Sequence, residues 1–480
     1  MQNDTQQTDR SSSLIKSAGI YAIGVFGSRL MMFLLVPLYS FFIAPAQYGY
    51  FDLCFMTVML LFPLLSLQLK EGAFRFLIEA DEEERRRQVI TFTARTLLMS
   101  AAILAVGSLL LAWIHPVDYL WLTAAFAITF ALYEVWIQIV RGLGHNAIYA
   151  EAGILSSALI CVVSMVLVAG LHMDITGIFI GNIVGRLLAL GYIEVRCGVL
   201  RRYLRPRMAD LRPLGRDMLR YSVPLIFVSL IHWTLSSSNR FFIEHDLGLE
   251  ENGLYAIAQK FAAIFEAVTF IGYQTWQEMA LRHYDDADRN AFFSKIFNAY
   301  IIALAALVAL ISFGVKVCYG WIVGSEYQSS IYYLFPLVMS SMWVTLSLFY
   351  DVAYQCAKQT HRAIWGLVMA AALSLVGNYV LIRAWGIYGA LLTVNLSYLS
   401  LVVYRIIDTR RYFIITLEPR TWLAVGLMLA SGMVFYLGLG VWAEIAWSVF
   451  AAVGFLLLVP TYVRSFVIDK IHAVLRPRRR

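Results

Sequence analysis

The sequence predicts an all-α integral membrane protein with about fourteen transmembrane helices. Hydrophobic residues make up 60% of its 480 positions, charged residues only 14%, and apolar stretches recur along the whole chain. An ordinary soluble domain is about half apolar and about a quarter charged. The apolar stretches hold roughly 20–25 residues, enough for a helix to cross ~30 Å of hydrocarbon. The ~10-residue alternating pattern of a membrane β-barrel is not found, which leaves helices to satisfy the backbone in lipid.

The loops between the apolar stretches predict how the helices are oriented. The expected spans are 17–43, 49–78, 89–113, 119–141, 147–170, 175–196, 217–243, 253–280, 292–316, 329–356, 363–383, 386–407, 421–440 and 443–466. Lys and Arg gather in every second loop, and the alternate loops contain almost none. Because short cytoplasmic loops are rich in Lys and Arg, both termini are expected to be cytoplasmic. The net charge of +7 therefore reflects topology and contact with anionic lipid rather than nucleic-acid binding.

Five segments describe the predicted domain organisation. Residues 1–16 form a cytoplasmic tail, 17–196 an N-lobe of six spans, 197–216 a basic cytoplasmic linker, 217–407 a C-lobe of six spans, and 408–480 an appended helix pair with a basic cytoplasmic tail. The linker is rich in Arg and contains two prolines, as expected for a segment along the membrane surface.

An internal repeat relates the two lobes. The segments YEVWIQIVRGLGHNAIY from Tyr133 and YDVAYQCAKQTHRAIW from Tyr350 share Tyr, an acid, Val, Gln, a base and His-x-Ala-Ile-aromatic. Two weaker matches occur, namely FFI at 41 and 241 and Ile-x-Gly at 175 and 387. Each repeat holds six spans and starts in the same direction, so the repeats are parallel. Such duplication is typical of transporters that bind substrate between two halves and rock one half against the other.

Ionisable residues within the spans are candidates for the functional site. A charge at the bilayer centre costs at least about 2.5–3.5 kcal/mol and usually faces a cavity or a partner. Arg29, in the sequence GSRLMMF, lies near the middle of the first span, too far from either end for its side chain to reach the interface. Either a water-filled cavity or a pair with a carboxylate would accommodate this cation.

Polar stripes at helical spacing follow the second, seventh and eighth spans. Their members are Gln68, Glu71 and Arg75 with Lys70 beside them; Ser229, His232, Ser236 and Arg240; and Gln259, Glu266, Tyr273 and Gln277 with Lys260 beside them. Two structural alternatives are open: Glu71 pairs with Arg75 along the helix, or Arg240 extends to the outer interface. Three of the four helices that begin the two repeats carry more bases than nearby carboxylates neutralise, which predicts a positive cavity that attracts an anion.

The sequence contains no motif that indicates catalysis. GxxxxGK[ST], HExxH and GxSxG do not occur, and the five cysteines are widely spaced without CxxC. We therefore predict a transporter rather than an enzyme, with no catalytic residue, cofactor or metal site. Transport without an ATPase module would draw on a gradient or on mass action. Glu266 and His232 are the best-placed proton carriers, although a His on a helix face is more often simply hydrogen-bonded.

Four segments carry a resemblance to a known family. SAGIYAIGVFGSRLMMFLLVPLYSFFIAPAQYGYFDL, LLSLQLKEGAFRF, RGLGHNAIYA and SSSNRFFIEHDLGLEENGLYAIAQKFA resemble polysaccharide-transport (Wzx-type) flippases of the multidrug/oligosaccharidyl-lipid/polysaccharide (MOP) exporter superfamily. The resemblance covers roughly the first twelve spans. It implies two six-helix lobes around a central cavity and translocation of undecaprenyl-diphosphate-linked oligosaccharide (O-antigen, capsule or exopolysaccharide) to the outer leaflet of the bacterial inner membrane.

The resemblance also implies which side chains contact the substrate. Cavity cations engage the diphosphate, and the positions that match by helix and depth are Arg29, Lys70, Arg75, Arg240 and Lys260. The implied partners are the lipid-linked glycan, membrane lipids and polysaccharide polymerase or export machinery. Alternatives are a lipid II flippase, a multidrug/cation antiporter of the same superfamily, and a non-transporting scaffold for polysaccharide assembly. The basic residues argue against the cation antiporter.

Overall fold

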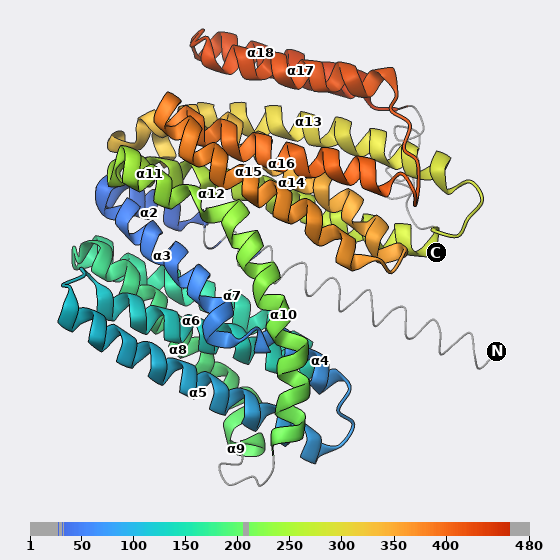
Figure 1. The fold of residues 1–480 in the computed structure, drawn as a ribbon. Helices are drawn as coiled ribbons and strands as arrows, with labels where there is room; N and C mark the ends of the chain where they lie inside the picture. Colours follow the sequence, from blue (N-terminus) through green and yellow to red (C-terminus); the bar gives the residue numbers. More distant parts are fainter. Residues whose placement is uncertain (1–26, 28–30, 32, 205–210, 461–480) are drawn as a thin grey trace, which may run out of the picture. The chain divides into compact units, whose positions relative to one another are not determined.

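Helices form every regular element of the computed structural model, which describes residues 27, 31, 33–204 and 211–460 (Figure 1). Twelve helices in these ranges are long and apolar enough to cross a membrane. The all-α membrane class is therefore confirmed. The α-helices are α2 (Leu35–Phe42), α3 (Pro45–Ser66), α4 (Leu69–Ile78), α5 (Glu83–Ile114), α6 (Leu120–Gly142), α7 (Asn146–Met165), α8 (Asp174–Cys197), α9 (Val199–Tyr203), α10 (Arg212–Ser237), α11 (Asn239–Leu247), α12 (Leu249–Arg282), α13 (Arg289–Ile322), α14 (Ile331–Cys356), α15 (Ala363–Trp385), α16 (Ile387–Thr409), α17 (Pro419–Tyr436) and α18 (Val441–Leu458).

The expected spans agree with these helices. The first span lies mostly outside the described residues, and α2 is its described end. The thirteenth span corresponds to α17, which has 18 residues and is not among the twelve candidate spans. Each of the other expected spans overlaps one helix or two consecutive helices. Three short segments of other helical types, Val166–Gly170, Ser325–Ser330 and Thr360–Arg362, flank α7, α14 and α15.

The second expected span is broken into two half-helices, α3 and α4. Leu67 and Gln68 take left-handed backbone angles, with φ of 44° and 52°. Pro63 lies inside α3 and has no N–H, so the carbonyl of Met59 loses its helical donor. The hydroxyl of Ser66, the last residue of α3, donates to the carbonyl of Phe62 at 2.7 Å. The chain therefore changes direction in the middle of a membrane-spanning stretch.

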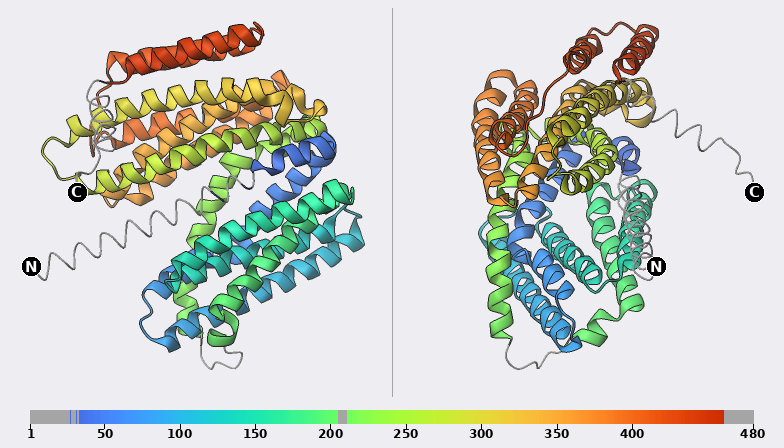
Figure 2. Two further views of the ribbon diagram at one scale, coloured as in Figure 1. Left: turned by 180° about the vertical axis from the view of Figure 1, so that it is seen from behind. Right: turned by 90° about the vertical axis from the view of Figure 1, so that its right-hand side faces the viewer.

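The chain divides into two compact units, Met1–Ala256 and Ile257–Arg480. In the first unit, α8 packs along α7 and α6; in the second, α16 packs along α15 and α14 (Figure 2). These are the neighbours expected if the last three helices of each sequence repeat are equivalent. The contacts group α10 and α11 with the first unit. The lobe boundaries expected from the sequence stay a prediction.

Glycines explain one of the weaker repeat matches. Gly177 and Gly389, the third residues of the two Ile-x-Gly segments, lie where a helix begins beside the preceding one. A Cβ on Gly177 would lie 2.9 Å from the side chain of Val168, and one on Gly389 would lie 1.9 Å from the carbonyl oxygen of Leu381. Small residues at such crossings let helix backbones approach closely in a membrane.

The appended helices α17 and α18 lie side by side and pack on α13 (red in Figure 2). The ammonium group of Lys316 on α13 lies 2.6 Å from a carboxylate oxygen of Glu444 on α18 and donates to the carbonyl of Phe435 at 2.6 Å. Near the other end of α13, Asn298 accepts a hydrogen bond from the Thr421 hydroxyl at 2.6 Å. Polar contacts therefore fix the appended pair at two depths.

Candidate functional site

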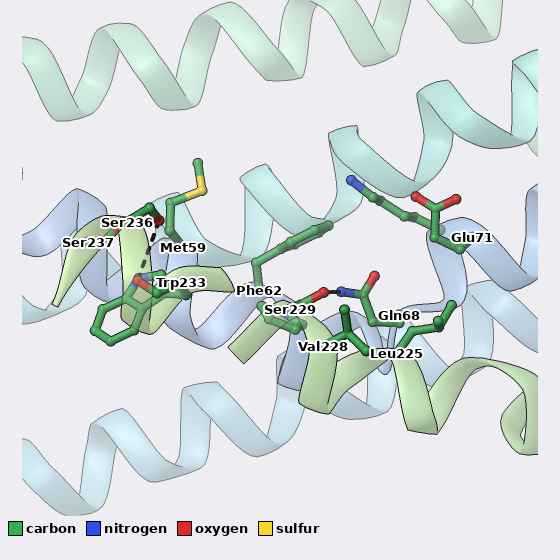
Figure 3. Close-up of a pocket in the computed structure, with 12 residues that line it drawn as sticks. Met59, Phe62, Gln68, Glu71, Leu225, Val228, Ser229, Trp233, Ser236 and Ser237 are labelled. Atoms are coloured by element: carbon green, nitrogen blue, oxygen red, sulfur yellow. Dashed lines mark hydrogen bonds between the residues drawn. The ribbon is translucent and has the colours of Figure 1, made fainter. Parts of the chain in front are cut away.

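A pocket of about 410 Å³ lies in the first unit, where α3, α4 and α10 meet (Figure 3). Both apolar and polar side chains line it. They are Met59, Phe62, Pro63, Gln68, Lys70, Glu71, Leu225, Val228, Ser229, Trp233, Ser236 and Ser237. The pocket thus sits beside the break between the two half-helices, the place where membrane transporters commonly bind substrate.

The polar stripes of the second and seventh spans meet at this pocket. Gln68, next to the break, donates a hydrogen bond from its side-chain amide to the hydroxyl of Ser229 on α10 (Figure 3). Glu71 on α4 and Ser236 on α10 also line the pocket. The two stripes therefore form one polar lining, although the residues that join them are 161 positions apart in the sequence.

The backbone break fixes the position of Gln68. Its side chain is only 4% exposed, and among the described residues its carbonyl oxygen Oε1 finds no hydrogen-bond partner. Gln68 directly precedes Leu69, the first residue of α4, so it stands at the positive end of that half-helix dipole. Unpaired backbone N–H groups at a helix N-terminus, together with the dipole, favour an anion.

Lys70 supplies a cation to the same pocket. Its ammonium group lies 5.3 Å from the centre of the Phe62 ring, and the side chain is half-buried. A cation over an aromatic face gains about 0.5–1 kcal/mol at exposed sites and more where water is excluded. Glu71 lines the pocket as well, so the site can bind an anion at one point and hydroxyl or amide groups at others.

Arg75 lies outside the pocket lining, on the exposed side of α4. Its Nε atom lies 3.3 Å from a carboxylate oxygen of Glu79, and its guanidinium lies 4.6 Å from the ring centre of Tyr221. The local partner is therefore Glu79 rather than Glu71. Both side chains of this pair are more than half exposed, so the pair contributes little stability.

Arg240 is buried at the end of the seventh span that is expected to face outward. Its Nε atom lies 2.8 Å from Oδ2 of Asp52 on α3, and its guanidinium lies 4.1 Å from the ring centre of Tyr255. Arg240 and Asp52 are each 3% exposed, so Arg240 does not extend to an interface. Sequence reasoning missed Asp52; the signal was an acid one turn past Gly49 in an otherwise apolar stretch.

The remaining predicted site residues are not brought into this pocket. Arg29 lies outside the described residues. His232 is exposed on α10 and is not among the lining residues. Lys260 and Glu266 belong to the second unit, where the Ser341 hydroxyl of α14 donates to Glu266 at 3.1 Å. Their roles stay predictions.

Two further buried arginines lie inside the units, one in each. Arg186 of α8 donates to the side chain of Asn182 at 2.8 Å and lies over the ring of Phe130 at 5.1 Å. Arg405 of α16 lies 2.9 Å from Asp351, the acid of the second repeat motif. The contacts of Arg186 with its own helix and with an aromatic ring indicate a structural role.

Comparison with known proteins places the chain in a family. A family model described as polysaccharide biosynthesis protein matches residues 14–276, more than half of the chain. No curated protein sequence matches. Among solved structures, the lipid II flippase MurJ in an inward closed conformation is similar with a TM-score of 0.66 and 12% identity, over 93% of this chain and 99% of that one.

Two multidrug transporters are similar as well. An inward-facing multidrug resistance MATE family transporter of the MOP superfamily has a TM-score of 0.58 and 14% identity, over 82% of this chain and 94% of that one. A mutant of the Vibrio cholerae MATE transporter VcmN has a TM-score of 0.54 and 14% identity, over 83% of this chain and 97% of that one. The chain therefore belongs to the polysaccharide biosynthesis protein family, with the fold of MOP-superfamily flippases and transporters.

Proposed function

We propose that the protein is a flippase that moves undecaprenyl-diphosphate-linked oligosaccharide units from the cytoplasmic to the outer leaflet of the bacterial inner membrane by alternating access. Family membership and a multi-pass transporter fold support this proposal. The observation that carries it is the pocket beside the α3–α4 break, where Lys70 and the start of a half-helix lie among hydroxyl and amide groups. Such a site suits an anionic head group attached to a sugar.

The diphosphate is the part of the substrate that a cation would recognise. Lys70 is the first contact we propose, since it lines the pocket and its ammonium group lies over the ring of Phe62. Gln68 and Ser236 offer hydrogen-bonding groups for phosphate or sugar oxygens. Arg29, Arg75 and Lys260 are the other contacts proposed from the resemblance. The resemblance suggests Arg240 as well, but this cation is buried in a pair with Asp52 and is given a different role below. The proposal needs no catalytic residue, cofactor or metal.

A lipid II flippase is the second candidate, and the similarity to MurJ favours it. Both candidate substrates carry a diphosphate on a polyprenyl lipid, so Lys70 would serve either one. The sugar separates them. Polysaccharide polymerase or export machinery is a proposed partner in the first case only.

The direct test is flipping by the purified full-length protein in liposomes. Labelled undecaprenyl-diphosphate oligosaccharide, labelled lipid II and an organic cation would be compared at equal protein density. We expect accelerated movement of the oligosaccharide lipid. Movement of lipid II alone would support the second candidate, cation export alone would support the antiporter, and movement of none of the three would support the scaffold.

A further inference from the structure

A buried polar cluster joins one end of α3 to α11 and to the start of α12. The predicted topology places this end of α3 on the outer side of the membrane. Asp52 and Arg240 form its ion pair, with the carboxylate oxygen and the guanidinium nitrogen 2.8 Å apart. The side-chain amide of Asn252 donates to the carbonyl of Gly49 at 2.8 Å. The amide of Asn239 donates to the Tyr255 hydroxyl at 2.7 Å. All of these residues belong to the first compact unit.

Two glycines make this crossing closer than ordinary helix packing. A Cβ on Gly49 would lie 1.9 Å from the carbonyl oxygen of Leu249, and a Cβ on Gly253 would lie 2.0 Å from the carbonyl oxygen of Pro45. The contact is reciprocal, because Pro45 and Gly49 lie in the first turns of α3 just as Leu249 and Gly253 lie in the first turns of α12, each after an FFI segment. The two helices therefore meet through the same surface, as in an isologous contact about a two-fold axis.

Some buried polar atoms of the cluster lack a hydrogen-bond partner. Among the described residues, Nη1 of Arg240 and the side-chain carbonyl oxygens of Asn239 and Asn252 are buried without a hydrogen-bond partner. Removing such groups from water costs free energy, and a buried ion pair offsets that cost only with good geometry and full hydrogen bonding. Water would satisfy these atoms if the crossing opened. The contact is thus held by one ion pair and two side-chain hydrogen bonds, while its unsatisfied polar atoms lower the free-energy cost of separating the helices.

We propose that this cluster is a latch that keeps the outward end of the α3–α10 seam closed, and that Arg240 works in the latch rather than as a contact for substrate. The helix α3 belongs to the first sequence repeat, whereas α11 and α12 belong to the second. Rocking one repeat against the other would have to separate Asp52 from Arg240 and Gly49 from Gly253. The pocket lies on the inner side of the latch, because Ser236 precedes Arg240 by one helical turn.

The test measures access to the pocket from outside, so it does not depend on which lipid is carried. Ser236→Cys, in a chain whose five native cysteines are replaced, would report on the pocket. Intact cells would be treated with a membrane-impermeant maleimide, and the labelling rate of full-length protein would be measured. With the latch intact, we expect slow labelling.

Breaking the latch is expected to speed this labelling. Asp52→Asn and Arg240→Gln should each raise the rate by roughly tenfold or more, since each leaves one partner of a buried pair without its countercharge. The exchange Asp52→Arg with Arg240→Asp should bring the rate back toward the starting value. Unchanged labelling in both single variants would overturn the latch.

Two matched controls separate a latch from general loosening of the fold. Lys316→Met breaks a partly buried ion pair in the second unit, between α13 and α18, and should leave labelling unchanged. Gly49→Ala should increase labelling, whereas Gly107→Ala, a helix position with no atom within 4 Å of the added Cβ, should not. Equal increases from Lys316→Met or Gly107→Ala would overturn the proposal.

A cross-link covers the case in which the charge variants fail to fold. Asp52→Cys with Arg240→Cys, in the otherwise cysteine-free chain, would be joined by a bifunctional maleimide with a reducible spacer, which ties α3 to α11. Flipping by the unjoined protein gives the baseline; joining the two thiols should stop flipping, and reduction should restore it. Full flipping by the joined protein would contradict the latch. If the unjoined protein flips no lipid, the labelling rates of the two glycine variants decide the proposal.

Discussion

The second helix of each repeat has a different form in the two halves of the sequence. The first repeat has two half-helices, α3 and α4, with a pocket beside the break, whereas the second has α12, which is continuous over 34 residues. Counting from the paired glycines Gly49 and Gly253, Pro63 corresponds to Ala267. Proline removes a helical hydrogen bond and alanine does not, so one residue type accounts for much of the difference.

The polar stripes on these two helices also have different surroundings. Gln68 and Glu71 line the pocket. In the second unit, Ser341 of α14 donates to Glu266 at 3.1 Å, and Gln277 donates to Gln355 of α14 at 2.6 Å. A polar stripe at helical spacing therefore marks either the lining of a pocket or a contact between helices, and Gln68 does both.

The largest expected effect comes from reversing the charge in the pocket. Lys70→Glu should lower the flipping rate by roughly 10- to 100-fold, because a charge-assisted contact to a phosphate is worth about 1.5–3 kcal/mol. Lys260→Glu, which reverses the predicted cation of α12, should have a smaller effect. Flipping in proteoliposomes at matched protein density measures both. A larger loss of flipping rate in Lys260→Glu than in Lys70→Glu would indicate that the diphosphate contact lies in the second unit.

Removing the proline tests whether the break itself matters. Pro63→Ala should raise the unfolding temperature, since a proline inside a helix costs about 3 kcal/mol, and it should slow flipping several-fold by favouring a continuous helix. Pro224→Ala in α10 is the control, because that helix is continuous around its proline. A Pro63→Ala protein that flips at the starting rate would show that the pocket does not need the break.

A variant of Glu266 tests whether the second unit couples transport to a proton gradient. If this carboxylate carries a proton, Glu266→Gln should remove the acceleration of flipping by an imposed pH gradient and leave the rate without a gradient nearly unchanged. Glu71→Gln in the pocket is the matched control and should keep the response. A gradient response that persists in Glu266→Gln would exclude this residue as the carrier.

The smallest expected effect concerns the hydrogen bond between Gln68 and Ser229. Gln68→Ala, Ser229→Ala and the double variant form a mutant cycle for thermal unfolding. A coupling of about 0.5–1.5 kcal/mol in the free energy of unfolding is expected for one partly buried hydrogen bond. If the losses in unfolding free energy were strictly additive, the hydrogen bond between the two stripes would contribute no stability.

The sequence was sufficient for the fold class and for most of the spans within the described residues, because a span depends on residues close together in the chain. The stripes were only partly predictive of the pocket, since Gln68 and Ser229 line it whereas Arg75 does not. The sequence was not sufficient for partners far apart. Asp52 and Arg240 are 188 residues apart, and no local pattern pairs them. Arg75 has Glu71 four residues before it and Glu79 four residues after it, so spacing alone could not select Glu79. A proline inside a helix is a common place for a bend, but Pro63 alone does not place the break at Leu67 and Gln68.

The most direct test of the central claim is the affinity of the purified protein for undecaprenyl-diphosphate oligosaccharide, compared among the starting protein, Lys70→Ala and Lys70→Arg. Arg282→Ala, which removes an exposed cation paired with Glu278, is the control. We predict that Lys70→Ala weakens binding by roughly tenfold or more, that Lys70→Arg keeps most of it, and that Arg282→Ala has no effect. Equal affinity in Lys70→Ala and the starting protein would contradict the claim that Lys70 binds the diphosphate.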